Sequence, residues 1–456
     1  MAVPEIKVNW RDSLAFHPGS ARVRKNKMRL TKWFTRILLT FLIASLLVGC
    51  SGLLSVGQPA EPVTLRFGFR KGYADYTKLA TDYHQANPNV TIELVPIEGY
   101  RPDAVPGKDL DLLRWDATYL TPDHQKNILR VDDYLNSSDT ISRDDFISGS
   151  LKALQVEGAQ YGMPAGVDPY IMYAGLNHFK GANMTLPTGQ WNMEEMVTLA
   201  QAANHQDLDP SDPNYSIGFC YVPDSLDTVL LTYLYGGQLF DRFPNPTAPT
   251  FNAPETIDAV KWIASLRQDY GIIPDPDQIQ TMYSRAGVNE AVVQDKCGFW
   301  FGLLSSYQGK VWGFEWKGEA RMLPLPYNQT PFNIANVDGY YIYSATKNPD
   351  AAWAWVAYLL DHQEAAGVML PPRKSQIQSD SFAQQAGKDI TTIARALPDN
   401  LVTMSFSIGD YQTLETVVMA YFSAVTDVEQ GKTDAATALM AVQDQAETQF
   451  NGQQSP

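Results

Sequence analysis

Residues 64–95 read TLRFGFRKGYADYTKLATDYHQANPNVTIELV, a strand pattern followed by a helix pattern and a second strand pattern. The first part alternates apolar and polar side chains through Phe67 and Phe69, which is the period of a half-buried strand. Helical spacing follows through Leu79 and Tyr83, and it ends at the sequence NPN. A strand, a helix and a strand in this order predict a parallel pair of strands covered by a helix.

The alternation of strand and helix patterns continues along the chain. LDLLRW at 110–115 is typical of a buried strand, and PDHQKNILRVDDYL at 122–135 has helical spacing. Capping signals mark three later helix starts, namely Asn192 three before Glu195, Asn252 three before Glu255, and Asn348 next to Pro349. These patterns predict an α/β fold in which helices cover both faces of a mainly parallel sheet.

An apolar run of 13 residues, 37–49, follows a basic stretch and ends at Cys50. A helix needs about 20 residues to cross a bilayer core, so this run is too short to span one. The order of basic, apolar and small residues is typical of a cleaved secretory signal. Leu47-Val48-Gly49-Cys50 resembles the lipobox of bacterial lipoproteins, in which the cysteine is acylated and becomes the first residue. An ordinary signal with an incidental cysteine is the alternative.

The charge of the chain argues against polyanionic partners. The whole chain has a formal net charge of −15, and without residues 1–49 it has 26 basic and 48 acidic side chains, a net charge of −22. Such an acidic surface disfavours nucleic acid and anionic lipid. Cys220 and Cys297 are the two cysteines after Cys50, and they either pair or remain two buried small hydrophobic residues, which is the interpretation we favour.

Enzymatic motifs are absent from the sequence. It has no G-x-S-x-G, no H-E-x-x-H, no phosphate-binding loop and no dinucleotide fingerprint. The acidic run DLDPSDPNYSIG at 207–218 lacks the glycine and the terminal glutamate of a calcium loop, so we interpret it as a solvated loop. We expect no metal and no cofactor.

Aromatic residues are numerous, with 10 Trp, 23 Tyr and 19 Phe. Several stand next to polar groups at predicted strand ends, such as Trp115 before Asp116 and Tyr170 near Asp168. Ligands of open α/β sheets bind beyond the carboxyl ends of strands. A sugar presents apolar C–H faces and a rim of hydroxyls, so its site needs aromatic rings and polar groups together. Each ring taken singly is also explained by core packing.

The order of segments resembles a known family, the carbohydrate-binding group (family 1) of extracytoplasmic solute-binding proteins of ABC importers. The similarity covers nearly all of residues 63–450. It rests on residues 64–95, on DLDLLRWDATYL, on DDFISGSLKALQVEGAQYGMPAGVDPYIMYAGLNHF, and on NVDGYYIYSATKNPDAAWAWVAYLL. The family's glycine pair before the last of these strands is replaced by Asp338-Gly339.

The resemblance implies two α/β lobes joined by crossing strands, with a ligand cleft between them. The implied division is a leader at 1–49 whose natural start is Met28, a tether at 50–62, lobe one at 63–174 and 302–343, and lobe two at 175–301 and 344–456. A sugar or oligosaccharide would bind between the lobes and favour their closure, without any bond being broken. We expect a monomer, anchored outside the cytoplasm by lipid on Cys50, that delivers the sugar to the importer permease.

The family's site residues are carried over by position. The implied ligand-binding residues are Arg70, Lys71, Tyr73, Trp115, Asp116, Tyr119, Asp168, Tyr170, Trp300, Asp338, Gly339, Tyr340 and Arg373. For Arg70 and Lys71 the alternative is solvated surface charge, and for Arg373 it is a salt bridge within a loop. We predict that Trp115 forms a wall of the sugar site, and its burial in a lobe core is the rival interpretation.

A second class of function remains open at this point, namely a secreted glycoside hydrolase. Such an enzyme needs two carboxylates about 5 to 10 Å apart, one with a raised pKa. Asp116 paired with Asp168 or Asp338 would be the candidates. An adhesion or scaffold lipoprotein is a third class, which leaves the order of segments unexplained.

Overall fold

A computed structural model describes residues 61–99, 108–180, 184–242, 246–274, 279, 282, 287–309, 315–399, 401–403 and 411–453. The predicted leader, with Met28 and Cys50, lies outside these residues, as does nearly all of the predicted tether. Residues 62–456 form a unit that is described here by itself. None of its described helices combines the length and the apolar character that crossing a bilayer requires.

The first strand, helix and strand form as the sequence predicts. Strand β1 (Val63–Arg70) buries Phe67 and Phe69 on one face. Helix α2 (Thr77–Ala86) follows, and strand β2 (Val90–Ile97) lies parallel to β1 along its whole length. The period-2 pattern and the helical pattern therefore specify this unit locally.

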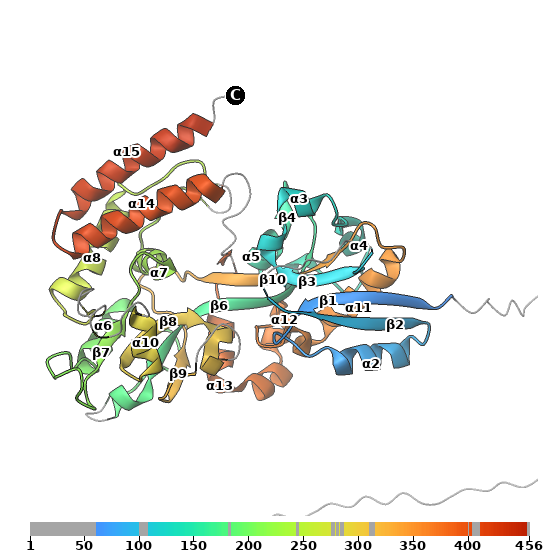
Figure 1. The fold of residues 1–456 in the computed structure, drawn as a ribbon, viewed down its shortest axis with the longest axis horizontal. Coiled ribbons are helices and arrows are strands. Elements are labelled where there is room, and N and C mark those ends of the chain that lie inside the picture. Colours follow the sequence, from blue (N-terminus) through green and yellow to red (C-terminus); the bar gives the residue numbers. More distant parts are fainter. Residues whose placement is uncertain are drawn as a thin grey trace, which may run out of the picture. The chain divides into compact units, whose positions relative to one another are not determined.

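The nine-stranded sheet has the order β2-β1-β3-β10-β6-β8-β7, with β11 beside β10 and β9 beside β6 (Figure 1). Its other strands are β3 (Leu112–Asp116), β6 (Met163–Gly175), β7 (Ile217–Cys220), β8 (Cys297–Leu303), β9 (Ala320–Leu323), β10 (Ile334–Ile342) and β11 (Val402–Thr403). Strands β4 (Gln155–Val156) and β5 (Ala159–Gln160) form a separate hairpin. The prediction of a mainly parallel sheet is wrong, because β10 runs antiparallel to β3 and to β6, and β6 also runs antiparallel to β8 and β9.

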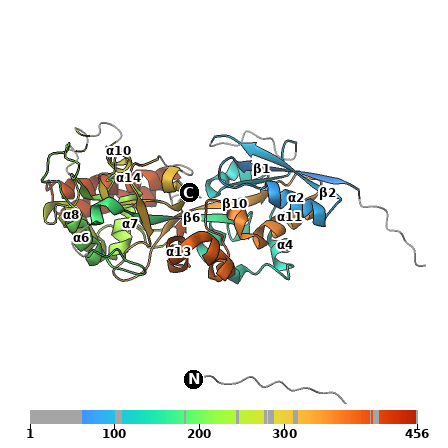
Figure 2. The same cartoon turned by 90° about the horizontal axis from the view of Figure 1, so that it is seen from below.

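Strand β6 is the element that ties the sheet together. Its first half pairs with β10 through Pro169, and its second half pairs with β8 from Tyr170 onward. The same second half also pairs with β9. In Figures 1 and 2 the strands β6 and β10 run between the elements around β1 and those around α7.

Helices cover the sheet. The remaining α-helices are α3 (Pro122–Gln125), α4 (Asp132–Asn136), α5 (Ser148–Lys152), α6 (Met193–Ala202), α7 (Leu226–Tyr235), α8 (Pro254–Gln268), α10 (Gly287–Val293), α11 (Pro349–Asp361), α12 (Lys374–Gln378), α13 (Asp380–Ala396), α14 (Tyr411–Glu429) and α15 (Ala435–Gln453). Short 3₁₀ turns are η1 (Ala117–Tyr119), η2 (Arg143–Asp145), η3 (Leu176–Phe179), η5 (Leu304–Gly309) and η6 (Gln363–Ala366). The helical pattern at 122–135 is split into α3 and α4.

The capping signals have different outcomes. Asn192 caps α6 with the full reciprocal box, since its side chain accepts from the amide of Glu195 and the Glu195 side chain accepts from the amide of Asn192. Asn348 is the N-cap of α11 but makes no side-chain cap hydrogen bond. At α8 the N-cap is Ala253, one residue after the expected Asn252, because Pro254 takes the first helical position.

The packing of two elements bears on the predicted lobe division. Trp355 of α11 lies in the same buried cluster as Leu65 and Phe67 of β1, although 344–456 was expected in lobe two. Strand β9 pairs with the half of β6 that contacts β8, although 302–343 was expected in lobe one. We therefore propose to move α11 to lobe one and β9 to lobe two, and the rest of the division stays a prediction.

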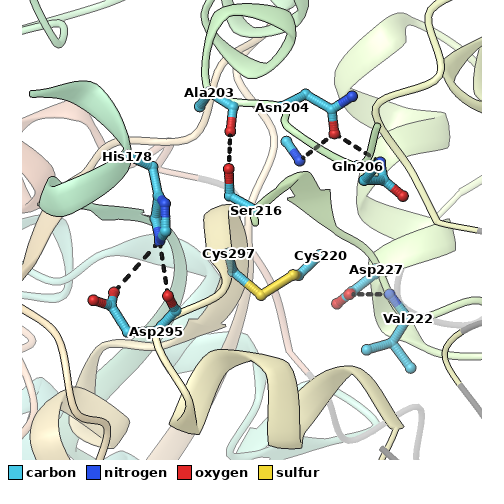
Figure 3. Close-up of a disulfide and its surroundings, with 11 residues drawn as sticks. His178, Ala203, Asn204, Gln206, Ser216, Cys220, Val222, Asp227, Asp295 and Cys297 are labelled. Carbon is cyan, nitrogen blue, oxygen red and sulfur yellow. Dashed lines mark hydrogen bonds and ion pairs between the residues drawn. A yellow bond between two sulfur atoms is a disulfide. The ribbon is translucent and has the colours of Figure 1, made fainter. Parts of the chain in front are cut away.

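Cys220 and Cys297 form a disulfide, so the favoured interpretation of two unpaired cysteines is wrong (Figure 3). Cys220 ends β7 and Cys297 begins the neighbouring β8, and their Cα atoms are 5.7 Å apart, within the range for a disulfide. Both residues are almost fully buried. The bond therefore closes a loop of sequence separation 77 across two adjacent strands.

Candidate functional site

Strands β1 and β3 are parallel neighbours that end side by side, at Arg70 and Asp116. In open α/β sheets this carboxyl edge is where ligands bind. Trp115 is the last-but-one residue of β3, and Tyr73 lies in the turn after β1. We call Arg70, Tyr73, Trp115 and Asp116 the strand-end cluster.

Arg70 organises this cluster. Its guanidinium carbon lies 4.5 Å from the centroid of the Trp115 ring and 4.6 Å from that of the Tyr73 ring. One terminal nitrogen donates to the Tyr73 hydroxyl at 2.7 Å, and the other forms an ion pair with Asp116. Because all of these groups contact one guanidinium, both rings and the carboxylate are held in one place.

Asp116 is the member of the cluster that solvent reaches. Its side chain is 23% exposed, whereas Trp115 is only 2% exposed. One carboxylate oxygen pairs with Arg70, and the other accepts from the amide of Thr118 at 3.1 Å and from the Thr118 hydroxyl. Thr118 is exposed, so the cluster presents a carboxylate and a hydroxyl at its surface.

A fully buried ion pair lies beside the cluster. Arg114 of β3 donates from Nε to Asp338 of β10 at 2.9 Å, and Asp338 is opposite Asp116 in the β3–β10 register. Burial raises the pKa of Asp338, whereas Arg114 and Arg70 lower it. The other Asp338 oxygen has no hydrogen-bond partner within the described part of the chain.

Arg114 uses its remaining N–H groups within the core. They donate to the Tyr76 hydroxyl at 2.7 Å and to the carbonyl oxygens of Ala365 and Ala366 at 2.8 and 2.9 Å. A buried charge is tolerated only when it is paired and hydrogen-bonded, and Arg114 meets this condition. The arrangement fixes β3, β10 and η6 relative to one another behind the strand-end cluster.

Asp168 lies where β6 passes from β10 to β8. It is completely buried and accepts from the amide of Ser305 at 2.8 Å and from the Ser305 hydroxyl at 2.6 Å. Burial raises the pKa of Asp168 to about 7, although the Ser305 hydrogen bonds lower it. The carboxyl group thus holds η5 against β6.

The other predicted site residues are not members of the strand-end cluster, although Lys71 follows Arg70 and Gly339 is opposite Trp115 in the β3–β10 register. Lys71 pairs with Glu98 at 2.7 Å, the Tyr119 and Tyr343 hydroxyls are 2.7 Å apart, Trp300 stacks on Tyr173, the Tyr340 hydroxyl contacts that of Tyr76, and Gly339 packs against Leu154. Arg373 forms ion pairs with Asp145 at 2.7 Å and with Asp361. For Arg373 the structure therefore contains the salt bridge that was the alternative interpretation. Ligand binding by all of these residues stays a prediction.

Tyr170 lies at a different place, a cavity of about 240 Å³. We call it the junction cavity, because it is lined by β6 at Tyr170 and Ile171, by Gln190, by the segment 324–333 and by the segment 393–398. It shares no lining residue with the strand-end cluster. Within the described residues, no group of three or more His, Cys, Asp or Glu side chains is placed to hold a metal ion.

Sequence reasoning missed Arg114, Ser305 and Asn333. Arg114 had a signal, since an arginine inside the apolar run LDLLRW requires a buried acidic partner. Ser305 and Asn333 carry no local signal, because their roles depend on contacts with β6 that only the fold creates.

Comparison with known proteins identifies the fold. No family model matches the chain. The maltose-binding periplasmic protein MalE from Listeria monocytogenes, in complex with maltose, is similar with a TM-score of 0.66 and 15% identity, over 87% of this chain and 100% of that one. The sugar-binding protein MalE from Xanthomonas citri is similar with a TM-score of 0.62 and 17% identity, over 86% and 98%.

An ABC substrate-binding protein from Listeria monocytogenes, in complex with cycloalternan, is also similar, with a TM-score of 0.62 and 12% identity over 86% of this chain and 100% of that one. At these identities the likeness concerns the fold, and it confirms the predicted fold class. The chain has the two-lobe α/β periplasmic-binding-protein fold that sugar-binding proteins of ABC transporters share.

Proposed function

We propose that this protein captures a sugar or an oligosaccharide and delivers it to the permease of an ABC importer. The observation that carries the proposal is the match of 85–87% of the chain to structures whose descriptions name bound sugars, among them maltose and maltotetraose. The ordered segments of the sequence support the same function independently. We expect the protein to act as a monomer.

The strand-end cluster is the proposed saccharide site. Asp116 and Thr118 offer an acceptor and a hydroxyl to sugar hydroxyls, and Lys71 stands exposed on the adjoining turn. One face of Trp115 is covered by Arg70, so a sugar would contact the edge of the ring or displace the guanidinium. Arg70, Lys71 and Arg114 each pair with a carboxylate, which favours an uncharged saccharide over an anionic one.

Capture without turnover is favoured over glycoside hydrolysis. The three candidate carboxylates are already engaged, Asp116 by Arg70, Asp338 by Arg114 and Asp168 by Ser305. Burial raises the pKa of Asp168 to about 7, which suits a general acid, but Asp168 is completely buried. A hydrolase would need two accessible carboxylates on opposite sides of the bond.

The proposed cycle uses two lobes with the ligand between them. Strand β6 is one crossing segment, since its halves pair with β10 and with β8. A saccharide that contacts both lobes binds the closed form more tightly than the open one, and so it shifts the equilibrium toward closure. The closed form would then dock on the permease.

The anchor is part of the proposal. We infer a mature chain that begins at Cys50, carries lipid on that residue and works outside the cytoplasm, with residues 51–62 as a tether. Intact mass spectrometry of the membrane-extracted protein would give the mass of residues 50–456 plus acyl groups. An unmodified residue before Cys50 in the mature protein would contradict the anchor.

A thermal-unfolding screen with mono- and oligosaccharides tests the function. A saccharide at 100 times its dissociation constant should add about 2.7 kcal/mol of stability. Asp116→Ala should weaken its binding at least tenfold. Asp123→Ala is the matched control, because Asp123 is an exposed carboxylate paired with Lys126 outside the cluster. Equal binding by both variants would reject the cluster as the site, and no stabilisation by any saccharide would reject the function.

A further inference from the structure

The junction cavity is a second place where a small molecule fits. Its volume of about 240 Å³ corresponds to about eight water molecules at roughly 30 Å³ each, so a single ordered water does not fill it. It is also smaller than the range of about 300–1,000 Å³ that is typical of sites for drug-sized ligands. Its walls come from three stretches far apart in the sequence and from Gln190.

Several polar side chains that line this cavity have unused hydrogen-bonding capacity. The hydroxyls of Tyr170 and Tyr327 and the amide of Gln190 make no side-chain hydrogen bond within the described residues. Asn333 is 5% exposed, and its Nδ2 donates to the carbonyl of Tyr170 at 2.9 Å. Its Oδ1 has no partner in the described part of the chain. An unfilled buried acceptor costs about 1–3 kcal/mol, so the wall favours a molecule that donates hydrogen bonds.

The charge of the lining favours an uncharged ligand. No described lining residue is acidic, so nothing there holds a cation. Arg395 is the one charged residue in the described lining, and its Nε and one terminal nitrogen point to the carbonyls of Ile377 and Gln378 at the end of α12. The positive charge is therefore already partly balanced by carbonyl oxygens at a helix C-terminus.

The apolar part of the cavity lining can contact the C–H groups of a sugar or a polyol. The rings of Tyr170, Tyr327 and Phe332 are joined by prolines and aliphatic side chains of the same three segments. Burial raises the pKa of Tyr170, and the carboxylates of Asp227 and Asp168 raise it further, so its hydroxyl stays protonated and can donate. Rings, neutral hydroxyls and amides together match a compact molecule with several hydroxyl groups.

We propose that the junction cavity is a second ligand site, which binds a small uncharged polyol or monosaccharide independently of the strand-end cluster. The two sites share no residue, so each is altered without touching the other. Binding in the junction cavity does not require that a saccharide first bind at the strand-end cluster.

Saturation-transfer NMR of the full protein with xylitol, glucose and gluconate tests this site. Ala396→Trp places an indole in the cavity from an exposed position at the end of α13, and Gln384→Trp is the control at an exposed position of the same helix outside the lining. Xylitol or glucose should bind saturably to the wild type, to Gln384→Trp and to Asp116→Ala. Binding to Ala396→Trp should be at least tenfold weaker.

A second variant keeps the test informative if Ala396→Trp misfolds. Tyr170→Phe removes only a hydroxyl, and it should weaken xylitol binding several-fold while circular dichroism stays unchanged. The proposal is overturned if no probe binds saturably up to about 10 mM, a limit that corresponds to roughly −2.7 kcal/mol. It is also overturned if gluconate binds more tightly than glucose, or if Asp116→Ala abolishes the signal while Ala396→Trp retains it. Equal saccharide binding by Asp116→Ala and Asp123→Ala would reject the strand-end cluster and leave this result unaffected, because the two sites share no residue.

Discussion

The contact between Arg70 and Trp115 contributes to packing, and it lies at the strand ends, where a ligand would bind. The Arg70 guanidinium stacks on the Trp115 ring and pairs with Asp116, so the ring is packed on one face by a charged group instead of an aliphatic one. Trp115 was predicted as a wall of the sugar site, and its burial fits the rival interpretation of a core residue. Measurements of stability and of saccharide binding distinguish a binding role of Trp115 from a structural one.

Replacement of Trp115 by alanine tests its structural role. A large aromatic residue lost from a packed interior costs about 3–5 kcal/mol, so Trp115→Ala should lower the free energy of unfolding of the ligand-free protein by that amount. Urea unfolding followed by far-UV circular dichroism measures the change. An unchanged midpoint together with weakened saccharide binding would instead establish Trp115 as a binding platform.

Asp168 should make stability depend on pH. Its pKa of about 7 in the folded protein lies above the value of about 3.9 in an unfolded chain, so between these values the native state holds a proton that the unfolded state has lost. The free energy of unfolding therefore falls as pH rises from about 4 to about 7.

The variant Asp168→Asn cannot titrate, and it keeps an acceptor for the Ser305 amide while its Nδ2 can donate to the Ser305 hydroxyl. Its profile should therefore be flatter by up to about 1.4 kcal/mol per pH unit. Asp227, whose pKa burial also raises to about 7, contributes the same slope in both proteins. Urea unfolding at a series of pH values measures both profiles. Parallel profiles would mean that Asp168 does not titrate in this range.

At the scale of elements, the Arg114–Asp338 pair joins β3 to β10. Removal of either partner leaves a buried charge uncompensated, so Arg114→Met and Asp338→Asn should each cost about 3–5 kcal/mol. The double variant should cost less than the sum, with a coupling of about 0.5–3 kcal/mol. A complete double-mutant cycle measured by urea unfolding gives this coupling. Strict additivity would mean that the two side chains do not interact in solution.

The disulfide between β7 and β8 is the second link between elements. It constrains a loop of sequence separation 77 in the unfolded chain, and bonds of this kind contribute about 2–4 kcal/mol. The variant with both Cys220→Ala and Cys297→Ala should be less stable by that amount. Wild-type protein in a strong reductant should approach the stability of the variant. Equal stability of oxidised wild type and variant would contradict a structural role.

At the scale of the whole molecule, the sequence predicted what local patterns determine. The alternation through Phe67 and the helical spacing at Tyr83 specify β1 and α2, because each pattern fits one element. The antiparallel placement of β10 was missed, since its pairing with β3 depends on contacts 224 residues apart, such as that of Arg114 with Asp338. The packing of α11 on β1 through Trp355 also joins residues far apart in the sequence, so local patterns do not predict it.

Part of the candidate site was predictable, because local patterns identify the strands that carry it. Arg70, Tyr73, Trp115 and Asp116 stand at the ends of two recognisable strands, so their meeting follows from parallel pairing. Tyr170 could not be assigned to its cavity, because the other walls come from Gln190, from the segment 324–333 and from the end of α13, which are far from Tyr170 in the sequence. Long-range packing therefore determines the junction cavity, whereas strand order determines the strand-end cluster.

The central claim is that the protein holds one intact saccharide. Native mass spectrometry of the purified protein, incubated with the saccharide that stabilises it most, tests this directly. The account predicts a complex whose added mass equals one unaltered saccharide per chain, and that complex should persist through hours of incubation while the free saccharide keeps its length. Shortened saccharide in the bound or free fraction, or no complex with any stabilising saccharide, would contradict the account.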